Sequence, residues 1–154
     1  MGIQKLLLPY NFTDRDRKAL EFTASTFAPH GNVEITLFHA YVWLPQAPVH
    51  DRQLSERLKS GMDYLQTRIR ELESDFHNVR DELIDRGFAP AQVRALFRPR
   101  KKELLDAILD LHRRERFSLI VLSRGPRRIS RFFAGSLHTG LLSALTDVTI
   151  CVVS

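Results

Sequence analysis

The chain has 154 residues, of which 44% are hydrophobic and 27% are charged. This length and composition suit one folded domain over residues 1–154, and no apolar run approaches the ~20 residues that cross a bilayer. The formal net charge of +5 raises the question of nucleic acid. However, the basic residues are not interleaved with aromatic ones and no nucleic-acid-binding motif is present, so the pattern favours solvated charge or a small-anion site. The two densest basic groups are Arg94, Arg98, Arg100, Lys101 and Lys102, and Arg124, Arg127, Arg128 and Arg131.

The first half of the predicted fold is a strand, a helix and a second strand. Residues 3–8 form a mostly apolar run that Pro9 ends, which predicts a buried strand. Thr13 or Asp14 is then expected to cap a helix. Residues 33–41 are rich in β-branched and aromatic side chains and predict the second strand.

One long amphipathic helix is predicted next, because apolar residues recur at spacings of three and four. They are Leu54, Leu58, Met62, Leu65, Ile69, Leu72, Phe76, Val79 and Leu83. We expect this stripe to cover the sheet. The alternative is a partner helix in a coiled coil.

Three more strands and two more helices complete the predicted fold. Strands are expected over residues 93–97, 117–122 and the apolar terminal run, with Pro99 at a place where a helix can begin and the last helix opening at Gly135 and Ser136. Alternating strands and helices predict an α/β fold, a doubly wound, mostly parallel five-stranded sheet of Rossmann-like type with helices on both faces. Ligands of such sheets bind outside the carboxyl ends of the strands.

Cys151 is the only cysteine, so an intrachain disulfide and a cysteine-rich metal site are excluded. Its valine neighbours predict a small buried hydrophobe, because they offer no base or positive charge that would activate a thiol. A reducing compartment fits this cysteine usage, and we expect a cytoplasmic protein.

The stretch over residues 119–136 reads LIVLSRGPRRISRFFAGS and precedes a helix and the terminal strand VTICVVS. Together with the opening KLLLPYNFTDRDRKAL, it resembles the universal stress protein family, whose fold is of the adenine nucleotide alpha hydrolase-like type. Nucleotide-binding members carry a loop with Gly, two residues, Gly, nine residues, Gly, and then Ser or Thr. Gly125, Gly135 and Ser136 match the last three of these elements, whereas Leu122 stands at the first glycine. A leucine side chain there can fill space that a glycine leaves to the ligand.

The resemblance implies a dimeric stress-response module that binds ATP or AMP, with Mg²⁺ if the ligand is ATP. The positions that it assigns to the nucleotide are Pro9, Tyr10, Asn11, Ala40, Arg124, Gly125, Arg127, Gly135, Ser136 and Leu137. Asn11 stands where the nucleotide binders commonly have an aspartate, so the carboxylate is lost. The resemblance also implies a homodimer through the strand that begins at Val148 and ends at Val153, whose apolar edge invites pairing.

Two other functions remain open. Leu122 and Asn11 favour a member that has lost nucleotide binding and acts as a dimerisation and protein-interaction module through its long helix. Weak phosphoester hydrolysis would need a metal and a polar cluster, for which Asp14 and Asp16 are the candidates. We assign no catalytic residue and no metal site. His39 is expected to be a hydrogen-bonded histidine at a strand end, and the histidines without ligand spacing are expected on the surface: His30, His50, His77 and His112.

Overall fold

A computed structural model describes residues 2–42, 52–124 and 137–154. Its elements in chain order are β1 (Gln4–Pro9), α1 (Asp14–Phe27), β2 (Val33–Val42), α2 (Arg52–Asp85), the 3₁₀ helix η1 (Pro90–Gln92), β3 (Val93–Arg100), α3 (Leu104–Glu115), β4 (Leu119–Ser123), α4 (Leu137–Ala144) and β5 (Thr149–Val153). The strands form one sheet in the order β3-β2-β1-β4-β5, and every pair is parallel. The predicted doubly wound α/β fold is confirmed.

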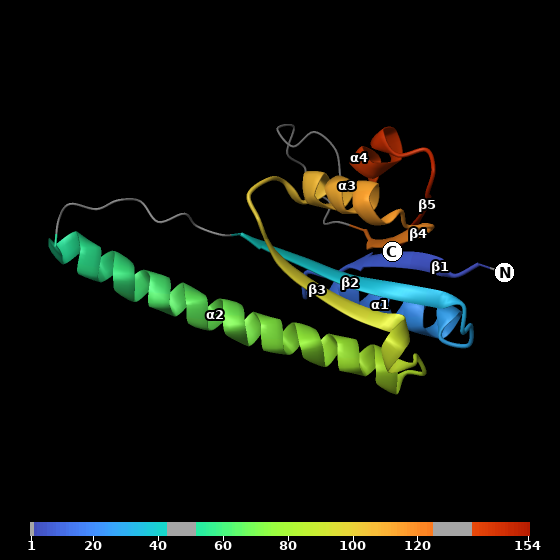
Figure 1. The fold of residues 1–154 in the computed structure, drawn as a ribbon, viewed down its shortest axis with the longest axis horizontal. Helices are drawn as coiled ribbons and strands as arrows, with labels where there is room; N and C mark the ends of the chain where they lie inside the picture. Colours follow the sequence, from blue (N-terminus) through green and yellow to red (C-terminus); the bar gives the residue numbers. More distant parts are fainter. Residues whose placement is uncertain (1, 43–51, 125–136) are drawn as a thin grey trace.

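Helices cover both faces of the sheet (Figure 1), and an apolar cluster fills the space on each side. In β1, Leu6 and Leu8 belong to the cluster under α1 and α2, while Leu7 belongs to the cluster under α3 and α4. All three leucines are at most 1% exposed. Successive side chains of a strand point to opposite faces, so a strand covered on both sides must be apolar throughout. This requirement explains the continuous leucine run in the sequence.

Helix α1 begins where the sequence predicts. The side chain of Thr13 accepts a hydrogen bond from the backbone N–H of Asp16 at 3.1 Å, and the Asp16 side chain bonds back to the cap residue. This capping box satisfies amides that the first helical turn leaves without partners. The inward side of the helix is formed by Ala19, Leu20, Thr23 and Ala24.

Helix α2 covers the sheet only with its C-terminal part. Phe76 and Leu83 are fully buried there, whereas Leu65 is 38% exposed. Figure 1 shows the N-terminal part of α2 extending beyond the sheet. The prediction that the whole stripe packs on the sheet is therefore wrong for this part. Length explains the difference, because 34 helical residues span about 50 Å while the 10 residues of β2 span about 33 Å.

Pro99 lies inside β3, opposite Tyr41 of β2, and does not begin a helix. The next helix, α3, begins only at Leu104, after Glu103. Because β3 is an edge strand, one of its sides has no strand neighbour, and an edge strand tolerates a residue without an N–H. Sequence reasoning missed this because proline normally ends a strand.

His112 is 2% exposed, so the prediction that it lies on the surface is wrong. Its Nδ1 accepts a hydrogen bond from the Phe117 N–H, and its Nε2 donates to Asp147 Oδ1, both at 3.2 Å. The imidazole therefore joins the end of α3 to the segment before β5. In the described part of the chain, no helix combines the length and apolar composition needed to cross a bilayer.

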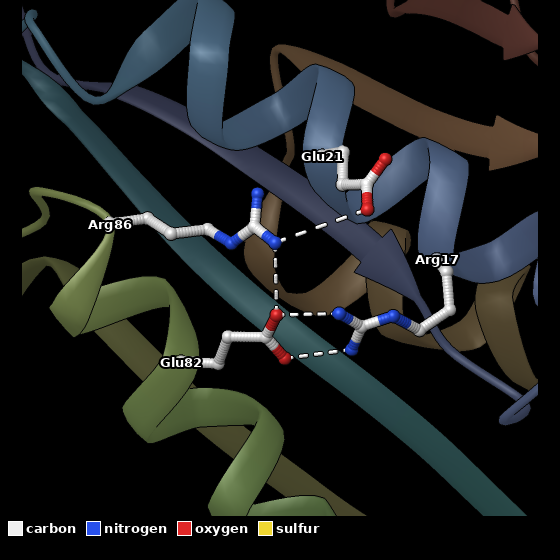
Figure 2. A network of polar contacts seen from close by, with 4 residues as sticks. All are labelled: Arg17, Glu21, Glu82 and Arg86. Carbon is white, nitrogen blue, oxygen red and sulfur yellow. Dashed lines mark hydrogen bonds and ion pairs between the residues drawn. The ribbon is translucent and has the colours of Figure 1, made fainter.

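A network of charges joins the two helices on one face of the sheet (Figure 2). Arg17 of α1 donates two hydrogen bonds to the carboxylate of Glu82 of α2, at 2.7 and 2.6 Å, and Arg86 contacts the same carboxylate at 3.1 Å. Arg86 also lies 3.9 Å from Glu21. The bonds from Arg17 lower the pKa of Glu82 below its ordinary value.

Replacing Glu82 with Gln is expected to lower the free energy of unfolding at neutral pH by about 0.5–1 kcal/mol, since the pair is partly solvated. Because the folded-state pKa of Glu82 is lowered, its ionised form stabilises the fold above the unfolded-state value, and this contribution disappears as the pH falls through the folded-state value. Urea unfolding from about pH 7 down to about pH 3.5 should show the two proteins converging at the acid end. Glu73→Gln, an exposed change on the same helix, serves as the control. An equal loss in both variants would contradict a specific Arg17–Glu82 contribution.

Candidate functional site

The carboxyl ends of β1 and β4 lie side by side at the centre of the sheet. Strand order reverses at this pair, because the chain runs from β1 to β2 and β3 on one side and from β4 to β5 on the other. The helices that follow the two strands accordingly lie on opposite faces, α1 on one and α4 on the other (Figure 1). In open parallel sheets, this arrangement leaves the crevice that holds a ligand.

The loop after β1 is held in an unusual shape by aromatic packing. Phe12 has a φ of 61°, in the left-handed region that non-glycine residues rarely adopt. Its ring meets Tyr10 at 5.1 Å and His39 at 5.4 Å between centroids, both edge to face. The left-handed conformation is unfavourable for a phenylalanine by itself. The packing of its ring in the aromatic cluster beneath the loop stabilises it here.

The carboxylate of Asp16 connects this loop to the end of β4. Its Oδ2 accepts hydrogen bonds from the N–H groups of Asn11 at 2.8 Å and Thr13 at 3.4 Å. Its Oδ1 accepts a bond from the hydroxyl of Ser123 at 2.6 Å. Asp16 is 5% exposed, so these bonds supply the partners that a buried polar group needs.

Asp16 therefore has a structural role, and it does not meet Asp14 in a polar cluster. Asp14 is exposed at the start of α1. Among residues 2–42, 52–124 and 137–154, no three His, Cys, Asp or Glu side chains gather closely enough to hold a metal ion.

His39 fastens the end of β1 to β2. The N–H of Tyr10 donates to Phe38 O, and the Tyr10 carbonyl accepts a bond from His39 Nδ1, each at 2.8 Å. Burial lowers the pKa of His39, which favours the neutral ring with its proton on Nδ1. The ring also stacks on Phe97 at 5.4 Å. The prediction of a hydrogen-bonded histidine at the strand end is confirmed.

Ala40 and Leu122 lie on the other side of the sheet, facing α3 and α4. They are 7% and 2% exposed and belong to one buried cluster, against which Leu137 of α4 packs. The Leu122 side chain thus fills interior space at the position that corresponds to the first glycine of the loop motif described above. An added side chain in this layer limits how closely a ligand can approach the backbone of β4.

Arg124 is fixed by its backbone, while its side chain is exposed. Its N–H donates to Val153 O of β5 at 2.8 Å, and its carbonyl accepts a bond from Arg15 Nη1 of α1 at 3.0 Å. The Arg15 side chain and the Arg124 backbone are therefore held together near the carboxyl end of β4.

The structure places six of the ten predicted ligand positions at this edge: Pro9, Tyr10, Asn11, Ala40, Arg124 and Leu137. The other four, Gly125, Arg127, Gly135 and Ser136, lie outside the described residues. Sequence reasoning missed the supporting contacts of Arg15, Asp16 and Ser123. The three-residue spacing of Thr13 and Asp16 is a capping-box signal that would have identified one of them.

Comparison of the fold with solved structures finds universal stress proteins over the full length of the chain. One from Lactobacillus plantarum superposes with a TM-score of 0.67 at 13% identity, covering 100% of this chain and 99% of that one. One from Archaeoglobus fulgidus, in complex with dAMP, gives 0.62 at 17% identity and covers 100% of both chains. One from Arabidopsis thaliana, with AMP bound, gives 0.59 at 15% identity and covers 97% of this chain and 90% of that one.

No protein-family model and no curated protein sequence matches the chain. At these identities the comparison concerns the fold. The chain has the fold of the universal stress proteins, and the resemblance predicted from its sequence is confirmed at that level.

Replacing Asp16 with Ala is expected to lower the free energy of unfolding by about 2 kcal/mol, because it removes one half of the capping box and leaves the Asn11 amide and the Ser123 hydroxyl without their acceptor. Asp14→Ala removes the same charge from the same helical turn but is expected to cost only a few tenths of a kcal/mol. Urea unfolding of both variants measures the difference. Equal losses would show that the charge of the first turn, and not the hydrogen bonds of Asp16, stabilises the edge.

Proposed function

We propose that the chain is a single-domain universal stress protein of the cytoplasm that binds an adenine nucleotide, AMP or ATP, or a related anion. The observation that supports this most is where the motif formed by Gly125, Gly135 and Ser136 falls relative to the strands and helices. In the sequence, Gly125 comes two residues after the end of β4, the strand at the reversal of strand order, and Ser136 immediately precedes α4. Solved structures with the same fold hold dAMP and AMP.

The proposed binding mode divides the edge into two parts. Pro9, Tyr10, Asn11 and Ala40 lie on the β1–β2 side and would contact the base and ribose. The phosphates would lie toward the start of α4, where amides without helical partners and the helix dipole attract anions. The residues proposed for this part are Arg124, Gly125, Arg127, Gly135, Ser136 and Leu137.

We propose binding without efficient turnover. His39 and Asp16, the buried imidazole and carboxylate nearest the edge, are both committed to structural hydrogen bonds. The Asp16 carboxylate accepts three hydrogen bonds, and the His39 ring is 8% exposed and packs against Phe12, so we propose neither as a general base on a bound phosphate. If the ligand is ATP, Mg²⁺ would be held mainly by its phosphates, as is usual for this ion.

The proposal is tested by the thermal stability of the purified protein with AMP, ATP and cyclic AMP, with and without Mg²⁺. A ligand that binds only the folded state raises the midpoint in a saturable way. Ser136→Leu should abolish the rise, since it blocks the phosphate end. Ser143→Leu, at an exposed position of α4, is the control and should keep it. No rise at millimolar nucleotide, or an equal rise in the Ser136 variant, would refute the proposed site.

We further propose that two copies pair through β5. Strand β5 forms one edge of the sheet, and Val152 is 37% exposed. The Thr149 N–H and the Val153 carbonyl bond toward β4. Residues alternate along a parallel strand, so the backbone groups of Val152 point to the open side, where they are free to pair with a second β5.

The exposed part of α2 supports a second candidate function, an interaction module that pairs through this helix. Met62, Leu65, Ile69 and Leu72 repeat at spacings of 3, 4 and 3 and line an apolar hollow of about 240 Å³ with Val42. Arg68 and Glu73 flank the stripe. In a parallel two-stranded coiled coil they would oppose each other across the pair, which favours a second copy as the partner.

One pair of variants separates the two interfaces. Val152→Pro removes only an outward N–H and should convert a β5-paired dimer to a monomer, while Leu65→Lys should leave that dimer intact. Light scattering after size exclusion measures the masses. If Leu65→Lys alone yields monomers, α2 is the interface and the β5 proposal is wrong. A wild type that is monomeric at all concentrations would exclude both.

A further inference from the structure

A second pocket lies beside the carboxyl end of β3, between this strand and α3. Its volume is about 220 Å³. Phe38, Ala40 and Leu111 form an apolar floor, and the side chains of Arg98, Arg100, Lys101, Lys102 and Arg114 surround it. The edge of the nucleotide site described above shares only Ala40 with this pocket.

The pocket carries far more positive than negative charge. Its lining has five cationic side chains and one carboxylate, Asp110. That carboxylate is already shared by Arg113 at 3.1 Å and Lys102 at 3.8 Å. Within residues 2–42, 52–124 and 137–154, the side chains of Arg98, Lys101 and Arg114 form no hydrogen bond or ion pair. Cations that converge without counter-ions repel one another and are stabilised by an added anion.

Arg100 supplies a second, independent indication. Its Nη1 donates to Lys102 O at 2.7 Å, but its Nε is buried and has no hydrogen-bond partner. The bond to Lys102 O holds the guanidinium at the lining of the pocket, and a guanidinium held in this way is suited to pair with two oxygens of a phosphate group.

The position of the pocket also favours the binding of an anion. Lys101 and Lys102 lie just before α3, separated from its first residue, Leu104, by the N-cap residue Glu103. The start of this 12-residue helix adds partial positive charge to that of the side chains. Charge alone would suit any anion, but Phe38 and Leu111 offer apolar surface for the body of an organic molecule.

We propose that this pocket binds a small organic phosphate, separately from the nucleotide at the β1–β4 edge. Arg98, Arg100 and Lys101 hold the phosphate group. The apolar floor holds the organic part, which distinguishes the preferred ligand from inorganic phosphate.

The test uses phenyl phosphate and inorganic phosphate as probes, with binding measured by titration calorimetry. Phenyl phosphate should bind saturably and about tenfold more tightly than inorganic phosphate, because covering one ring face is worth about 1.4 kcal/mol. The double variant Arg98→Ala, Lys101→Ala changes two exposed residues and should weaken phenyl phosphate at least tenfold. Lys18→Ala, an exposed cation on α1 across the sheet, should leave binding unchanged.

Three results would overturn the proposal. They are no saturable binding of either probe, an equal loss of phenyl phosphate affinity in the double variant and in Lys18→Ala, and equal affinities of the wild type for the two probes. The first excludes a site, the second indicates general charge attraction, and the third indicates that the apolar floor takes no part. The outcome is separable from the nucleotide proposal. Ser136→Leu should retain phenyl phosphate binding, and the double variant should retain the AMP-induced rise in thermal midpoint if the nucleotide site is real.

Discussion

The hydrogen bonds of Asp16 determine the shape of the central edge of the sheet. One oxygen of this carboxylate holds the amides of the loop after β1, and the other holds the hydroxyl of Ser123 at the end of β4. The two strands on either side of the reversal are thereby joined through one buried group. Helix α1 starts at the same point, so its direction, and with it the cover over one sheet face, depends on these bonds. A rigid edge of this kind is what a ligand site needs, because its shape is set before binding.

The two faces of the sheet differ in what they offer a ligand. On the α1–α2 side, the aromatic cluster around Phe12 and His39 closes the space beneath the loop. On the α3–α4 side, Ala40 leaves room at the end of β2, while Leu122 fills the interior below the end of β4. Positive charge gathers on this second side, on Arg124 and around the end of β3. This is the side from which we propose that the edge receives an anion with an organic body.

The sequence was sufficient for the architecture because the signals for a parallel sheet are local and strong. Leucine runs, helical spacing and the cap at Thr13 predicted the order of the elements and the presence of helices on both faces of the sheet. Three features needed spatial information. The exposed part of α2 follows from the length of the helix relative to the sheet, the place of Pro99 from β3 being an edge, and the burial of His112 from its bond to the distant Asp147.

The candidate site was predictable in part. Resemblance to a family placed Asn11, Ala40 and Arg124 at one edge, and the structure brings them to the carboxyl ends of neighbouring strands. It did not reveal the bond from Ser123 to Asp16, because the two residues are 107 positions apart. The basic group at the end of β3 was visible as composition, but only the packing of α3 against it produces a pocket.

The most direct test of the account is amide NMR of the labelled protein during titration with AMP. We predict saturable shifts that are largest at Asn11, Ala40 and Arg124, around the reversal of strand order, with little change along the exposed part of α2. Absence of any saturable shift, or shifts confined to the β3–α3 pocket, would contradict the assignment of the β1–β4 edge as the nucleotide site.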